Sequence, residues 1–191
     1  MRIALTGTPG TGKSTVAALL PYRIIDINAL VKGGLNLGID PERGCLEADM
    51  DGLEMRLDEL DNISDLDATD NTDRTAAFNA SNITIIEGHI SHYFTDSAIV
   101  LRLDPKELKK RLLARGYSEK KIRENLEAEA LDAILIEAVE FCDQVDEINT
   151  TGHSPTEVAD LVVGIIQGNI RQPPGQVSWL EDFIDSGQAE D

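Results

Sequence analysis

The sequence predicts an α/β domain in which helices flank a parallel, doubly wound sheet. Short apolar runs such as ITIIEG and AIVLRL alternate along the chain with stretches of helical periodicity. Neither run alternates cleanly between apolar and polar residues, as expected for strands that are covered on both faces. The chain has 191 residues, which is enough for one such domain with a sizeable core.

The first half of the chain begins with a strand and a helix and then turns polar. A strand is predicted at 2–6, followed by a glycine-rich loop and by KSTVAALL, which is typical of a helix. A second strand is predicted at 23–27. Residues 28–82 are polar and acidic, with a Gly-rich loop and helices expected at about 49–61 and 69–81. We therefore expect this segment to be an insertion that covers the core.

The second half of the chain is predicted to supply the remaining strands. These are expected at 83–88, 98–103 and 145–151. After the second of them, Asp104 is placed as a helix N-cap and Pro105 at the first helical position. A short break then precedes one long helix that runs to about Cys142. The result is a sheet of about five parallel strands with right-handed crossovers.

The C-terminal region is predicted to contain a final helix and a tail. Ser154 is expected to cap this helix, and Pro155 follows it. The sequence then becomes a linker with a small amphipathic piece that carries Trp179, the only tryptophan. The expected organisation is therefore one folded domain over 1–171, followed by a linker and an acidic tail over 172–191.

Composition limits the possible functions. The formal net charge is −18, which argues against broad or sequence-specific nucleic-acid binding but suits a basic protein partner. No apolar run approaches the roughly 18 residues that cross a membrane, and the N-terminus does not resemble a secretory signal. We therefore expect a cytoplasmic protein. Cys45 and Cys142 are far apart in sequence and are expected to be buried or bystander residues rather than a disulfide or metal site.

The segment GTPGTGKST at 7–15 carries the pattern G-x-x-x-x-G-K-[ST] between a predicted strand and a predicted helix. Its glycines allow backbone N–H groups to turn inward around phosphates, and the N-terminus of the following helix favours negative charge. Lys13 is expected to meet the β- and γ-phosphates of a nucleotide, and the Ser14 hydroxyl to bind Mg²⁺. The sequence therefore predicts a P-loop.

An acid and a histidine follow the third predicted strand, in IIEGH. Glu87 occupies the place of a Walker B acid beside the P-loop. It is expected to bind Mg²⁺ through water, because Glu is one methylene longer than the more usual Asp. His89 is expected to contact an acceptor phosphate or to orient water, with a structural role as the alternative. His92 and Tyr93 have weaker claims, and the two histidines do not make a metal site by themselves.

Two further segments favour a small-molecule kinase over a molecular switch, which the P-loop alone does not decide. No guanine-reading Asn-Lys-x-Asp sequence is present. Residues 28–51 are predicted to form a flap over the acceptor. Within the flap, Lys32 is the candidate cation for a monophosphate and Arg43 a weaker one. Residues 114–124 are predicted to form a lid.

The predicted lid gathers cations in an otherwise acidic chain. It holds Arg115, Lys120, Lys121 and Arg123. Closing this patch over the phosphates would neutralise charge that develops during transfer and would exclude water. Arg111 lies one helical turn before Arg115, so both can point the same way. For these residues and for the flap cations, the alternative is ordinary solvated charge.

Three stretches together resemble one family: LTGTPGTGKST, IIEGH and RGYSEKKIRENLEAEALDAILIEA. Over residues 1–168 the chain resembles the archaeal and nuclear atypical adenylate kinases, a family also known as an assembly ATPase of the small ribosomal subunit. The lid sequence, followed by Asn125, Glu127 and Glu129, is the most specific part. The resemblance implies a P-loop NTPase of the nucleoside monophosphate kinase type, with an acceptor flap and a lid.

The resemblance also implies site residues. For the ATP phosphates these are Gly10, Gly12, Lys13, Ser14 and Thr15, with Arg115 as the lid arginine. Glu87 and His89 fall on the family's acid-x-His Walker B element. Lys32 stands where many members carry an arginine, and Lys offers a point charge in place of a bidentate fork. Either His153 or Ser154 matches a residue before the last helix that touches ATP.

The activity that the resemblance implies is Mg²⁺-dependent ATP + AMP ⇌ 2 ADP. Lys13, Arg115 and Arg111 would act with Mg²⁺ by alignment and charge neutralisation, and the anionic acceptor phosphate would need no strong general base. The resemblance further implies ATPase turnover and binding of a basic small-subunit ribosomal protein during maturation of the small ribosomal subunit and its RNA. Two alternatives stay open: an assembly ATPase with little kinase activity, or a kinase for another small acceptor such as shikimate or dephospho-coenzyme A.

Overall fold

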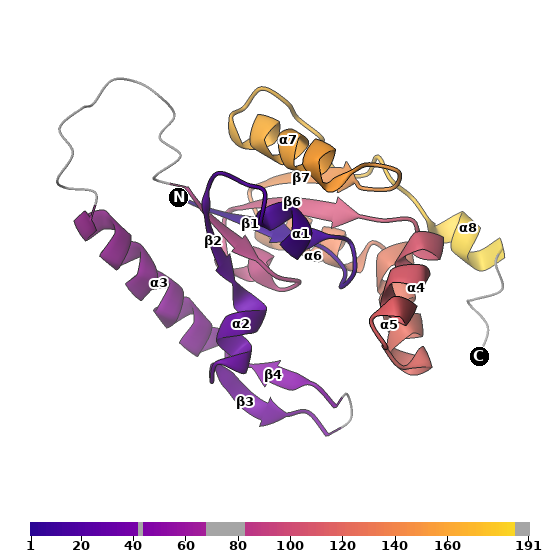
Figure 1. The fold of residues 1–191 in the computed structure, drawn as a ribbon, viewed down its shortest axis with the longest axis horizontal. Coiled ribbons are helices and arrows are strands. Elements are labelled where there is room, and N and C mark those ends of the chain that lie inside the picture. The colour runs from indigo at the N-terminus through magenta and orange to yellow at the C-terminus, as the bar shows by residue number, and fades with distance from the viewer. Residues whose placement is uncertain (42–43, 68–82, 186–191) are drawn as a thin grey trace. The chain divides into compact units, whose positions relative to one another are not determined.

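The structure is a computed structural model that describes residues 1–41, 44–67 and 83–185. The chain divides into two compact units, Met1–Ile25 with Ala80–Asp191, and Asp26–Asn79. The larger unit contains the sheet, and the smaller contains a hairpin and two helices (Figure 1). The helix expected at 69–81 and the flap cation Arg43 lie outside the described residues.

The larger unit is built on a five-stranded sheet with the order β2-β5-β1-β6-β7. Its strands are β1 (Arg2–Thr6), β2 (Arg23–Asp26), β5 (Thr84–Glu87), β6 (Ser97–Arg102) and β7 (Gln144–Asn149). β1 pairs in parallel with β5 and with β6, and β6 pairs in parallel with β7. The predicted parallel sheet is confirmed. Because parallel strands end on the same side, the loops that follow them meet at one edge.

Helices cover both faces of this sheet. α1 (Lys13–Ala17) and α7 (Pro155–Ile166) pack on one face, and α6 (Ala133–Phe141) packs on the other. Leu5 belongs to the first layer and its neighbour Ala4 to the second, because successive side chains of a strand point to opposite faces. Burial on both faces explains why the strands read as continuous apolar runs.

A helical hairpin follows β6. α4 (Pro105–Ala114) begins after Asp104, whose carboxylate accepts a hydrogen bond from a backbone N–H of the first turn, so the predicted cap is confirmed. α5 (Glu119–Ala130) begins after Ser118, whose hydroxyl caps it in the same way. The expected lid segment therefore spans the turn between two capped helices.

The long helix expected up to Cys142 is wrong, because the chain breaks between α5 and α6. Asp132 has a φ of 57°, in the left-handed region that interrupts a helix. The guanidinium group of Arg102 binds the Asp132 carboxylate and the carbonyl oxygen of Glu129. In a continuous helix that carbonyl would accept from the N–H four residues later. A tertiary contact therefore takes the place of the helical hydrogen bond that this carbonyl would accept from Ala133.

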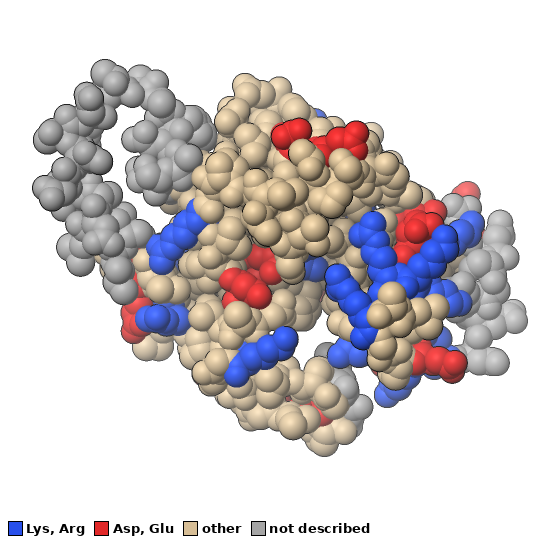
Figure 2. All heavy atoms as spheres, viewed as in Figure 1, with Lys and Arg blue, Asp and Glu red and all other residues tan. Residues whose placement is uncertain are grey.

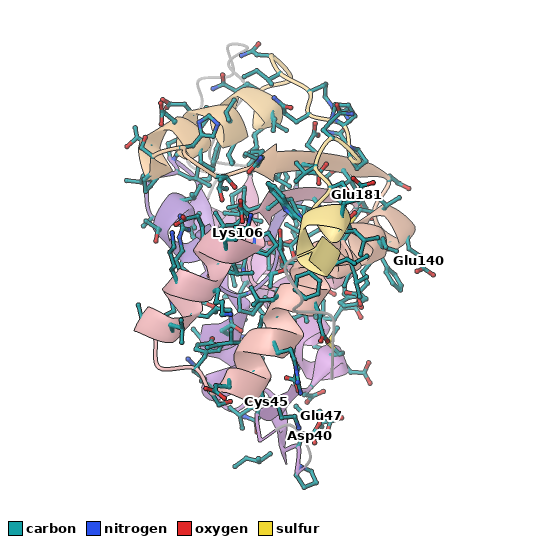
Figure 3. The ribbon with its side chains drawn as sticks, turned by 90° about the vertical axis from the view of Figure 1, so that its right-hand side faces the viewer. Asp40, Cys45, Glu47, Lys106, Glu140 and Glu181 are labelled. Atoms are coloured by element: carbon teal, nitrogen blue, oxygen red, sulfur yellow. The ribbon has the colours of Figure 1, made fainter. Side chains whose placement is uncertain are left out.

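The segment after α7 packs against the helical hairpin of the larger unit. Phe183, in α8 (Leu180–Asp185), is buried with side chains of α4 and α5, and Trp179 packs against the same cluster. Figure 3 shows α8, which carries Glu181, beside α4, which carries Lys106. The amphipathic piece expected in the tail is thus a helix that contacts the lid helices. The position of the domain boundary stays a prediction.

The smaller unit contains a hairpin that the sequence analysis missed. β3 (Asn36–Ile39) and β4 (Leu46–Ala48) pair antiparallel, with an irregularity between Asn36 and Gly38. The turn is closed by the Asp40 N–H, which donates to the Cys45 carbonyl oxygen at 2.8 Å; both residues are labelled at the hairpin in Figure 3. Glycine is depleted in strands, so this stretch reads as a loop in sequence.

Two helices flank the hairpin within the smaller unit. α2 (Ile27–Lys32) begins after Asp26, whose carboxylate accepts from two backbone N–H groups. α3 (Met50–Asp67) confirms the helix expected from 49 and extends beyond its expected end. No helix in the described ranges combines the length and the apolar character needed to cross a membrane.

Candidate active site

The loop between β1 and α1 makes a close approach to the end of β6. Gly7, Gly10 and Gly12 have φ values of 135°, 106° and 109°. A Cβ atom on Gly7 would lie 2.3 Å from the backbone carbonyl oxygen of Leu101, so any side chain there would force the backbone apart. The glycines of the motif thus allow the loop to turn against the sheet edge.

Lys13 is folded back beneath this loop. Its Nζ atom donates to the carbonyl oxygens of Gly7 at 2.7 Å and Thr8 at 3.1 Å, and the residue is 7% exposed. Burial lowers the pKa of Lys13 to about 8, while the negative charges of Glu87 and Glu129 oppose that decrease. The ammonium group is therefore surrounded by acceptor oxygens at the position where a P-loop lysine meets phosphate.

Ser14 and Glu87 bring two oxygen donors together at the ends of α1 and β5. The Ser14 hydroxyl donates to Oε1 of Glu87 at 3.1 Å. Ser14 is exposed, whereas Glu87 is buried. Hydroxyl and carboxylate oxygens are the hard ligands that Mg²⁺ takes, and Mg²⁺ usually completes its shell with phosphate oxygens and water. This pair fits a magnesium ion carried by a nucleotide.

The two histidines after β5 have different surroundings. His89 keeps an exposed side chain, although desolvation and the charge of Lys13 lower its pKa to about 4. His92 is fully buried, with Nδ1 3.2 Å from the Thr6 hydroxyl and Nε2 3.3 Å from the Glu137 carboxylate. His92 is therefore part of the packed interior, whereas His89 faces solvent and is neutral at pH 7.

The helices α4 and α5, which flank the predicted lid, bring positive charge to the P-loop. Nη1 of Arg111 donates to the carbonyl oxygen of Gly10 at 3.3 Å. Arg115 lies at the end of α4, and its charge contributes to the lowered pKa of Lys13. Both arginine side chains are exposed and so are accessible to a ligand. Figure 2 shows Lys and Arg side chains gathered over α4 and α5.

Three other candidates are placed as follows. Lys32 ends α2 in the smaller unit and is exposed, and its contact with an acceptor stays a prediction. Ser154 caps α7 in a capping box with Glu157, which confirms the predicted cap. His153 is exposed just before that cap. An ATP contact from His153 or Ser154 stays a prediction.

The sequence analysis missed a buried charge cluster behind the P-loop. Arg102 is 2% exposed and binds the carboxylates of Glu129 at 2.8 Å, Glu147 at 2.7 Å and Asp132. Its sequence signal is a charged residue inside an apolar strand, in AIVLRL and again in VDEIN. Charged residues are almost never fully buried without a partner, so such positions predict paired charges.

Comparisons with known proteins identify a matching family model and similar sequences. A family model described as "AAA domain" matches residues 3–132. A protein of Methanosarcina acetivorans named "Putative adenylate kinase" is 42% identical over 194 residues, which is 95% of this chain and 98% of the relative. A protein of the same name from Archaeoglobus fulgidus is 41% identical and covers 97% of this chain and 95% of its own length.

A solved structure of shikimate kinase from Acinetobacter baumannii, in complex with shikimate, has a similar fold. The TM-score is 0.51 at 17% sequence identity, and the match covers 88% of this chain and 93% of the other. At this identity the likeness concerns the fold alone. It agrees with a central parallel sheet flanked by helices.

Proposed function

The chain belongs to the same family as the archaeal proteins named "Putative adenylate kinase", and from this premise we propose that it transfers the γ-phosphoryl group of Mg²⁺-ATP to AMP. The coarser assignment is a P-loop nucleotide kinase. One observation carries phosphoryl transfer: Lys13, the Ser14–Glu87 oxygen pair and Arg111 all meet at a single glycine-rich loop. This arrangement supports phosphoryl transfer rather than passive phosphate binding. The name of the archaeal relatives supports AMP as the acceptor.

ATP binding would add phosphate contacts to those that the P-loop makes with itself. Lys13 donates to two carbonyl oxygens of the loop, and the third N–H of its ammonium group would meet the anionic oxygens of the β- and γ-phosphates. Ser14 and Glu87 would hold Mg²⁺, the Glu87 carboxylate through water. When bound, Mg²⁺ would neutralise part of the charge of the ATP phosphates.

Transfer requires alignment and charge neutralisation more than proton chemistry. A phosphate oxygen of AMP attacks the γ-phosphorus while the bond to the β–γ bridging oxygen breaks, which leaves two molecules of ADP. The attacking oxygen is already anionic near pH 7, so no strong base is needed. Arg111 and Arg115 would stabilise the charge on the transferred group. His89 is neutral at this pH because its pKa is about 4, so it would orient the acceptor phosphate or water by hydrogen bonding.

The test is phosphoryl transfer by the purified protein. Mg²⁺-ATP is supplied with AMP, CMP, UMP, GMP or shikimate in turn, and with no acceptor, while ADP formation is followed by chromatography. We expect ADP formation with AMP to exceed the rate without acceptor by at least about 10²-fold. Transfer to shikimate alone would replace the proposal with a kinase for another acceptor. ATP hydrolysis at one rate in every mixture would indicate an ATPase.

We also propose, as a second function, ATPase turnover during maturation of the small ribosomal subunit with a basic ribosomal protein as partner. The net charge of −18 supports a basic partner. A cytoplasmic location is part of this proposal. The test is ATP hydrolysis without AMP, with and without a purified basic small-subunit ribosomal protein. A rate change that polylysine of matched charge reproduces would contradict a specific partner.

A further inference from the structure

Glu129 belongs to the sequence that follows the lid, and the proposed mechanism gives it no role. It lies near the end of α5 and is 2% exposed. Its Oε2 atom accepts a hydrogen bond from the hydroxyl of Thr8 at 2.5 Å. Thr8 is the second residue of the P-loop, so an acid of the lid helices binds the phosphate loop directly.

We propose that Glu129 is a positioning residue for phosphoryl transfer, which fixes Thr8 and, through Thr8, the ammonium group of Lys13. The inference rests on the proposed function of the P-loop as the ATP site. The Thr8 carbonyl oxygen accepts from Nζ of Lys13 at 3.1 Å and from the N–H and hydroxyl of Thr11 at 3.2 and 3.0 Å. If Thr8 turned, Lys13 would lose a partner and the loop would lose its internal turn.

The Glu129 carboxylate is itself held rigidly. Oε1 accepts from Nε of Arg102 at 2.8 Å and from the N–H of Leu103 at 3.0 Å. Nη1 of Arg102 donates to Glu147 at 2.7 Å, and the second oxygen of Glu147 accepts two backbone N–H groups of the C-terminal segment. Buried polar groups that are all paired hold one geometry, which is the property a positioning residue needs.

The first experiment breaks the Thr8 contact without altering the charge cluster. Thr8→Val keeps the shape of the side chain and removes the hydroxyl, whereas Thr8→Ser keeps the hydroxyl. We expect kcat for transfer from ATP to AMP to fall about tenfold in Thr8→Val, with KM for AMP unchanged, and to stay within about twofold in Thr8→Ser. A wild-type kcat in Thr8→Val, or an equal loss in Thr8→Ser, would overturn the proposal.

The second experiment measures ATP binding and needs no acceptor. Binding of Mg²⁺-ATP is followed by calorimetry in the wild type, in Thr8→Val and in Thr8→Ser. We expect the Kd for ATP to rise about fivefold in Thr8→Val, because the Lys13 ammonium group loses its fixed position, and to stay within about twofold in Thr8→Ser. An unchanged Kd in a folded Thr8→Val protein overturns the proposal. A raised Kd in a protein that fails to phosphorylate AMP supports this inference while refuting the proposed function.

Discussion

The two compact units of the chain differ in how much apolar surface they bury. In the larger unit, three hydrophobic clusters cover both faces of the sheet and the lid helices. In the described part of the smaller unit, few large apolar side chains are buried, namely Ile27, Val31, Leu53 and Leu57. Others remain exposed there, namely Leu37, Ile39, Leu46, Met50 and Met55. The larger unit therefore has a packed hydrophobic core, whereas the described helices and hairpin of the smaller unit bury little apolar surface.

This difference indicates that the two units have different roles. The P-loop, Glu87 and the Arg102 cluster are fixed by buried strands and paired charges, so the proposed ATP site is preorganised. A hairpin with few buried contacts opens at a lower free-energy cost than a core strand. We therefore expect the smaller unit to adapt to its acceptor. Changes in the two units should then alter different measured quantities.

The largest effect is expected from Lys13→Ala in the rigid unit. Removing the cation that meets the β- and γ-phosphates should lower kcat for transfer to AMP by about 10²–10³-fold. The protein should stay folded, because the strands remain intact, with a small fall in melting temperature as the Gly7 and Thr8 carbonyl oxygens lose a donor. Lys106→Ala on the exposed side of α4 is the matched control and should keep wild-type turnover. Retained transfer in Lys13→Ala would refute the assigned ATP site.

The next largest effect is on stability, and it compares the two units directly. Leu101 on β6 is fully buried, so Leu101→Ala should lower the free energy of unfolding by about 2–5 kcal/mol. Leu37 on β3 is 67% exposed, so Leu37→Ala should change it by less than about 0.5 kcal/mol. Urea denaturation measures both. Similar losses in the two variants would mean that the hairpin is buried against something in solution.

The same difference explains what could be predicted from sequence. The strands of the larger unit read clearly because burial on both faces makes each one a continuous apolar run. The P-loop follows β1 directly and is recognised from a local motif. Because β5 lies beside β1, its last residue Glu87 comes close to Ser14. The hairpin at 36–48 was missed because its strands are short, contain glycine and bury little, so no periodicity marks them.

The Arg102 cluster could not be predicted from local pattern. Its partners lie 27, 30 and 45 positions further along the chain, and no sequence rule pairs one charge with another at such separations. The break of the long helix has the same origin, because Arg102 binds the Glu129 carbonyl oxygen and the Asp132 carboxylate at the end of α5. Both errors come from tertiary contacts that override local propensity.

A third prediction compares how kcat/KM for ATP and kcat/KM for AMP depend on pH. Lys13 has a pKa of about 8 in the free protein, so its positive charge is lost as pH rises through 8. We expect kcat/KM for ATP, which reports the free enzyme, to fall about fivefold between pH 8 and pH 9. Bound phosphates favour the charged lysine, so kcat/KM for AMP at saturating ATP should decline only at higher pH. Coincident declines for both substrates would contradict a role of Lys13 on the ATP side alone.

The smallest effect is expected in the smaller unit, at Lys32. An exposed ion pair with a phosphate contributes at most about 1 kcal/mol, so Lys32→Ala should raise KM for AMP about two- to fivefold and leave KM for ATP unchanged. Lys32→Arg should lower KM for AMP, because the guanidinium fork binds phosphate through two hydrogen bonds. Arg56→Ala, an exposed cation of α3 in the same unit, is the control. If KM for ATP rose instead, Lys32 would belong to the ATP side, and the assignment of separate substrates to the two units would fail.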